Sequence, residues 1–142
     1  MTYCVAMRLS QGLIFASDSR TNAGFDQIST FRKMHTFRGE DRSLVLLSAG
    51  NLATSQSVVS LLEKRSTQDT RNLLNVGSLF EAAELTGSTI REVIQRDNPG
   101  GASSTVDFTC SIILGGQIRG AEQQLFNIYP EGNFIESTPE TP

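Results

Sequence analysis

The chain is poor in the residues from which metal centres and disulfide networks are built. Its 142 residues include one histidine, His35, and two cysteines, Cys4 and Cys110. A zinc site needs three or four ligands at short spacings, which these residues do not supply. Both cysteines lie in apolar runs typical of strands, so we expect two reduced core residues. The sequence predicts no metal site, and an ordinary structural role for His35.

Long apolar runs, a leader and a basic stripe are also missing. The longest apolar runs, such as Leu44 to Leu47, are far shorter than the roughly 20 residues of a membrane-spanning helix. The N-terminus lacks the basic region and apolar core of a signal peptide. The 12 basic residues are scattered, and the formal net charge is -3. We therefore expect a cytoplasmic protein that binds neither membranes nor nucleic acids.

Two glycine pairs, Gly100-Gly101 and Gly115-Gly116, do not match a phosphate-binding loop. We interpret both pairs as turns. Together with the missing metal ligands, this predicts a protein without a cofactor.

Alternating apolar residues predict strands in two groups. The first group is a hairpin from Tyr3 to Ala16, broken at Ser10-Gln11-Gly12, followed by strands near Gln27–Thr30, Lys33–Phe37 and Ser43–Ala49. The second group comprises Phe108–Leu114, Leu125–Tyr129 and Asn133–Ile135. Each boundary coincides with a glycine-rich or polar interruption.

Helical periodicity predicts two helices between the groups of strands. One runs from Leu52 to about Lys64, with Asn51 as its cap. The other follows the capping box Ser78 to Glu81 and ends at Asn98-Pro99. Its apolar face, from Leu79 to Ile94, is wide. Segregated strands and helices indicate one α+β domain, residues 1–142, with largely antiparallel sheets.

The N-terminus offers a nucleophile that needs no histidine. Met1 precedes the small residue Thr2, a pair that favours removal of the methionine. Thr2 would then carry a free α-amine, whose reference pKa near ~8 suits it to accept the proton of its own hydroxyl. On its own this feature is common, so the residues that follow decide its meaning.

The order of the following elements resembles proteasome-type, N-terminal-nucleophile hydrolases. Asp18 lies sixteen residues after Thr2, and Lys33 follows in the next strand within one residue of the family spacing. The apolar strand ending in Ala49-Gly50 leads directly into a helix, as in that family. Two short motifs are most similar to the bacterial ancestral-beta-subunit (Anbu) branch of this family. They are Ser19 to Asn22 and Leu-Ser-Ala-Gly-Asn at Leu47–Asn51.

The resemblance implies a fold, an activity and a set of roles. The fold is a four-layer αββα sandwich, and the activity is that of a threonine-type endopeptidase in intracellular protein degradation. Thr2 would attack the peptide carbonyl, Asp18 would hold Lys33 beside it, and the Gly50 N–H would stabilise the oxyanion. Thr21 and Asn22 would hold the substrate backbone. The implied partners are a peptide or unfolded protein and further copies of the chain, in a ring or helical stack.

Each residue also has a simpler interpretation, and two other functions stay open. Asp18 fits a turn aspartate, Lys33 a solvated strand lysine and Gly50 a joint between strand and helix. The chain would be a non-catalytic scaffold subunit if Met1 is retained. It would be an amidase if the site is a closed pocket for a small amide.

Two expectations concern the chain as a whole. The segment Ser137–Pro142 is where the family continues into further helices and strands, so we expect the natural sequence to continue and a sheet face to be bare or covered by another segment. The wide apolar face of Leu79 to Ile94 exceeds what one sheet covers, which predicts self-assembly.

Overall fold

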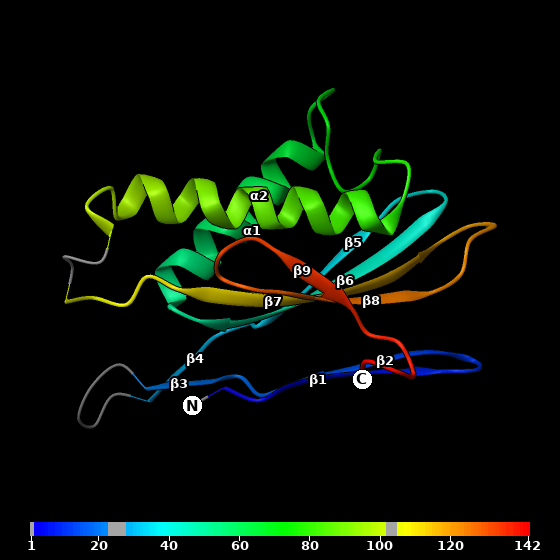
Figure 1. Cartoon of the computed structure of the whole chain (residues 1–142), viewed down its shortest axis with the longest axis horizontal. Helices are drawn as coiled ribbons and strands as arrows, with labels where there is room; N and C mark the ends of the chain where they lie inside the picture. Colours follow the sequence, from blue (N-terminus) through cyan, green and yellow to red (C-terminus); the bar gives the residue numbers. More distant parts are fainter. Residues whose placement is uncertain (1, 23–27, 102–104) are drawn as a thin grey trace.

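The protein folds into three layers, seen in a computed structural model that describes residues 2–22, 28–101 and 105–142 (Figure 1). Two helices cover one face of a five-stranded sheet, and a two-stranded hairpin covers the other. In chain order the elements are β1 (Cys4–Leu9), β2 (Gly12–Ser17), β3 (Arg20–Asn22), β4 (Ile28–Thr30), β5 (Met34–Arg38), β6 (Arg42–Gly50), α1 (Leu52–Ser66), α2 (Leu79–Asp97), β7 (Cys110–Ile118), β8 (Gln124–Ile128) and β9 (Phe134–Glu136). The predicted α+β class is confirmed.

All strand pairs are antiparallel. The large sheet has the order β5-β6-β7-β8-β9, while β1-β2 and β3-β4 form separate two-stranded ribbons. Both helices are inserted between β6 and β7, which are adjacent and pair along nine residues each. In the described part of the chain, neither helix is long and apolar enough to cross a bilayer.

The predicted helix caps are present. Asn51 accepts a hydrogen bond from Thr54 N at 3.1 Å, and Ser78 accepts one from Glu81 N at 3.1 Å. The return bond of the predicted capping box differs, because the Glu81 carboxylate accepts from Gly77 N at 2.9 Å. Both helices therefore begin with a paired backbone N–H.

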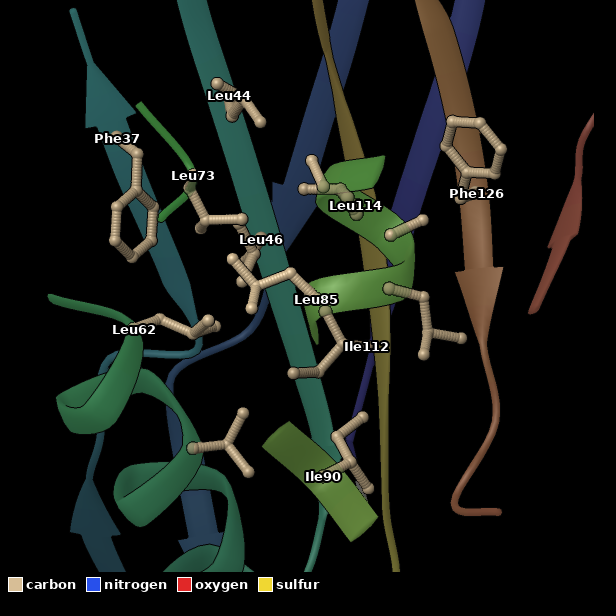
Figure 2. Packing of buried hydrophobic residues seen from close by; sticks show 14 of the residues in the cluster. Phe37, Leu44, Leu46, Leu62, Leu73, Leu85, Ile90, Ile112, Leu114 and Phe126 are labelled. Atoms are coloured by element: carbon tan, nitrogen blue, oxygen red, sulfur yellow. The ribbon is translucent and has the colours of Figure 1, made fainter. Parts of the chain in front are cut away.

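The core lies between the helices and the large sheet (Figure 2). Alternate residues of β6 and β7 point to the helices and are fully enclosed, with Leu44, Leu46 and Leu114 at 0% exposure. They pack against Val58 and Leu62 of α1 and against the apolar residues of α2.

The wide apolar face of α2 is covered within the chain. Leu79, Ala83, Ile90 and Val93 are buried, and Phe80, which is 56% exposed, packs edge-on against Phe134 at 5.1 Å. α1 and the sheet together cover what one sheet alone would not. The width of this face therefore gives no separate support for self-assembly, and that expectation rests on the family resemblance.

The prediction of a turn at Gly115-Gly116 is also wrong. Both glycines lie inside β7 and pair with β6 and β8. A Cβ on Gly115 would lie 2.6 Å from Phe15 Cζ and 2.4 Å from Leu125 Cδ2. The glycine thus makes room for the ring through which the hairpin packs on the sheet.

The outer face of the hairpin is apolar and exposed. Its exposed apolar side chains are Tyr3, Val5, Met7, Leu9 and Ile14, with exposures between 42% and 69%. Cys4 lies on the inner face and is only half-buried, which corrects its assignment to the core, whereas Cys110 is buried as expected. The described residues form one helical layer of the expected sandwich, on the side away from the hairpin.

Candidate active site

The hairpin brings Thr2 beside Asp18. The β1-β2 register pairs Cys4 with Ser17, and one step further Asp18 N donates to Tyr3 O at 3.0 Å. Tyr3 N donates in turn to Asp18 Oδ1 at 2.9 Å. The fifteen residues between Thr2 and Asp18 therefore form one hairpin, and its open end carries both side chains.

Lys33 joins the hairpin to the large sheet. It lies just before β5 and is 6% exposed. Its ammonium donates to Thr2 Oγ1 at 3.3 Å, to Asp18 Oδ1 at 2.8 Å and to Arg20 O at 2.7 Å. A lysine ammonium has three protons, and three acceptors surround this one. A buried charge of this kind needs such a complete set of partners.

The carboxylate of Asp18 is held in its charged form. The hydrogen bond from Lys33 lowers its pKa below the ordinary value, and the hydrogen bond from Tyr3 N lowers it further. The Asp18 side chain is 31% exposed, so solvent screens part of this interaction. The site therefore pairs an ionised carboxylate with the lysine that contacts Thr2.

Gly50 ends β6 with a backbone N–H directed away from β7. Asn51 N donates to Thr109 O of the β7 side at 2.8 Å. Successive N–H groups of an antiparallel strand alternate in direction, so the Gly50 N–H points to the opposite side, as does Ser48 N, which donates to Lys33 O at 2.9 Å. On that side β5 pairs only as far as Leu47. Gly50 thus extends past its neighbouring strand.

A small cavity unites these groups. It has a volume of about 140 Å³, and its lining residues are Thr2, Arg20, Thr21, Lys33, Ser48, Ala49, Gly50, Leu52 and Ser55. A larger cleft of about 1020 Å³ lies at the other end of the hairpin, between Ser10 and Ser137, and is lined by neither Lys33 nor Thr2. The small cavity therefore brings Thr2, Lys33 and Gly50 together.

The remaining predicted residues have different positions. Thr21 lines the cavity. Asn22 ends β3 opposite Ile28, and its side chain, like Met1, lies outside the described part of the structure. His35 is half-buried on β5, where burial lowers its pKa, and it does not line the cavity.

Two serines that line the cavity, Ser48 and Ser55, were not predicted from the sequence. Ser48 and Ser55 are both buried, at 6% and 5% exposure. Ser55 lies on the first turn of α1, four residues after Asn51, and its Oγ donates to Asn51 O at 2.8 Å. The sequence contained two indications of these residues. Ser55 lies four residues after the predicted cap Asn51, and Ser48 lies two residues before Gly50.

Solved structures of similar proteins share this fold. An Anbu (ancestral beta-subunit) from Yersinia bercovieri is 59% identical, with a TM-score of 0.88, and the chain covers 57% of it. The helical assembly of the Anbu complex from Pseudomonas aeruginosa is 54% identical, with a TM-score of 0.89, and the chain covers 58% of it. In both comparisons 98% of this chain is matched.

A more distant curated relative agrees with this likeness. Proteasome subunit alpha 1 of Haloarcula marismortui is 26% identical over 95% of the chain, which spans 48% of that protein. No family model matches the sequence. The chain spans little more than half of the length of its solved relatives, and it belongs to the ancestral beta-subunit (Anbu) family of proteasome-like proteins.

Proposed function

We propose that this proteasome-related subunit is a threonine-type endopeptidase whose nucleophile is Thr2 after removal of Met1. The observation that carries the proposal is the position of the Lys33 ammonium, 3.3 Å from Thr2 Oγ1 and 2.8 Å from Asp18 Oδ1. A simple solvated lysine would not be 6% exposed between a threonine hydroxyl and a carboxylate.

The proposed reaction proceeds in two stages. Thr2 Oγ attacks the peptide carbonyl carbon while its hydroxyl proton passes to the free α-amine of Thr2. The carbonyl oxygen gains the negative charge and accepts a hydrogen bond from the Gly50 N–H, an interaction worth about 3 kcal/mol in acyl transfer. Collapse expels the amine of the product with that proton, and water then hydrolyses the ester.

The neighbouring residues support this chemistry. Lys33, held by Asp18, lowers the pKa of the α-amine as an adjacent cation and so keeps it able to accept a proton at neutral pH. Thr21 and Asn22 on β3 contact the substrate backbone by strand-like pairing. The substrates are peptides or unfolded proteins in the cytoplasm, and the active form is a homo-oligomer.

Intact mass and activity of the full-length protein test the proposal. We expect a mass without Met1, and Thr2→Ala and Lys33→Ala should each reduce peptide turnover to below about 1% of the wild-type rate. Thr36→Ala, an exposed threonine on β5, is the matched control and should retain full activity. Wild-type turnover by Thr2→Ala would show that the nucleophile is wrong.

Two other functions are outcomes of the same experiment. A retained Met1 with no turnover would identify a scaffold subunit. Hydrolysis of small amides without cleavage of longer peptides would identify an amidase.

A further inference from the structure

The Gly50 backbone is held in a conformation that depends on a distant segment. Gly50 has φ of +108°, which L side chains rarely adopt. A Cβ there would lie 2.6 Å from Thr109 O and 2.9 Å from Cys110 Cα. The end of the segment Asp107–Cys110 therefore packs directly on Gly50, through Thr109 and Cys110, and limits the backbone conformation that Gly50 can adopt.

Asn51 connects Gly50 to that segment by its backbone and its side chain. Asn51 N donates to Thr109 O at 2.8 Å, and Asn51 Nδ2 donates to Asp107 O at 2.8 Å. The other side-chain atom, Oδ1, accepts from Thr54 N at 3.1 Å as the cap of α1. A single residue thus joins the helix, the end of β6 and the segment before β7.

Asp107 closes the segment on itself. Its Oδ1 accepts from Thr109 N at 2.9 Å and from Thr109 Oγ1 at 2.7 Å. These two bonds lower the pKa of Asp107, so the carboxylate is ionised at neutral pH. The resulting turn presents Asp107 O and Thr109 O to Asn51.

The cap of α2 shows that helix capping alone does not require these contacts. Ser78 caps α2 through one bond from Glu81 N at 3.1 Å. Asn51 caps α1 in the same way and, in addition, donates two hydrogen bonds, both to the segment that packs on Gly50. Neither of these two bonds pairs a backbone group of α1, so capping does not account for them.

We propose that Asn51 and Asp107 are positioning residues that orient the Gly50 N–H toward the carbonyl oxygen of the substrate. They touch neither the substrate nor Thr2. They hold Thr109 O against Asn51 N, which fixes the peptide unit between Gly50 and Asn51 and so the backbone conformation of Gly50. The proposal rests on the proposed peptidase function, because it assigns to these residues a part in stabilising the oxyanion.

Two substitutions in the full-length protein separate positioning from capping. Asn51→Asp keeps a side-chain acceptor for Thr54 N but loses the amide donor to Asp107 O. Asp107→Ala removes both bonds to Thr109. We expect each to lower kcat about 10-fold with KM within twofold, a smaller loss than the roughly 100-fold or greater loss seen when an oxyanion donor is removed altogether. Ser78→Ala, the matched cap variant on α2, should lower the melting temperature and leave kcat within twofold.

Crystal structures of the two variants give a reading that needs no turnover. We expect the Gly50 peptide to rotate away from the Thr2 side in both, and not in Ser78→Ala. An unmoved Gly50 N–H, or kcat within twofold of wild type in both variants, would overturn the inference. Thr2→Ala with wild-type turnover would instead overturn the proposed function, so the two failures are distinguishable.

Discussion

The two faces of the five-stranded sheet are packed very differently. On the helix face, Leu44, Leu46 and Leu114 have 0% exposure beneath α1 and α2 (Figure 2). On the other face, a thin hairpin leaves Val5 and Met7 exposed on its far side. Thr2 and Asp18 belong to the hairpin, while Lys33 and Gly50 belong to the sheet. The free energy of folding is thus concentrated on one face and the candidate site on the other.

The largest loss of stability is expected from a substitution in the core between the helices and the sheet. Leu46→Ala in the 142-residue chain should lower the free energy of unfolding by about 2–5 kcal/mol, because it leaves a cavity in a fully enclosed core. Leu13→Ala on the half-buried inner face of the hairpin should cost about 1 kcal/mol. Urea denaturation measures both. Equal losses would show that the two faces contribute equally.

A smaller effect targets the contact between the hairpin and the sheet. Gly115→Ala should lower the free energy of unfolding by about 1–3 kcal/mol, because the added Cβ meets the Phe15 ring and Leu125. In the full-length protein it should also lower peptide turnover, since the hairpin carries Thr2.

The matched control for this change is Gly39→Ala. Its Cβ would lie 3.3 Å from Arg42 Cγ and 3.7 Å from Leu74 Cδ2, which are milder contacts than those at Gly115. Denaturation midpoints of the two variants give the comparison. An unchanged denaturation midpoint for Gly115→Ala would mean that the hairpin does not pack on the sheet through Phe15.

The ion pair between Asp18 and Lys33, which connects the hairpin to the sheet, should weaken in acid. The pKa of Asp18 is lowered by Lys33 and by Tyr3 N–H, so its contribution to stability is present above the unfolded pKa of about 3.9 and is lost as the pH falls through the lower folded value. Asp18→Asn should therefore be less stable than wild type at pH 7, and this difference should shrink below pH ~4. Asp69→Asn, at an exposed position, is the control. Denaturation at both pH values tests this, and a difference independent of pH would contradict it.

The smallest effect is expected on the outer face of the hairpin. Met7→Ser in the 142-residue chain should change the free energy of unfolding by less than about 0.5 kcal/mol, because the methionine is 47% exposed. Calorimetry is suitable for so small a change. A loss above about 1.5 kcal/mol would mean that another molecule or a second copy covers this face.

Local patterns predicted most of the fold. The 3.6-residue periodicity after Gly50 and after Ser78 marks both helices, and the observed caps are the predicted ones, because a cap depends only on residues within one turn. The predicted end of α2 at Asn98-Pro99 is confirmed, whereas α1 continues to Ser66, two residues beyond its predicted end near Lys64.

Contacts between residues distant in sequence explain the errors. Gly115 is typical of a turn by local rules, but its role is to admit Phe15, a hundred residues earlier. The exposure of Cys4 similarly depends on how the inner face of the hairpin packs on the sheet, where Cys4 Sγ donates to Ser48 O. For the site, the resemblance to the proteasome family selected Asp18, and the observed hairpin register explains why Asp18 lies at the same end of the hairpin as Thr2. The Asn51–Asp107 contact joins segments 56 residues apart, and no local pattern predicts it.

The β1-β2 register also fixes how the site tolerates changes in chain length. Tyr3, the six residues of β1, a two-residue connection and the six residues of β2 form a molecular ruler between Thr2 and Asp18. An insertion of one residue in either strand would turn the following side chains to the opposite face, so that Asp18 would point away from Lys33. Many side chains in the two strands are exchangeable, but the number of residues in each strand is not. Among homologous chains, variation within these strands should therefore consist of substitutions, and any insertion or deletion should lie in the turn between them.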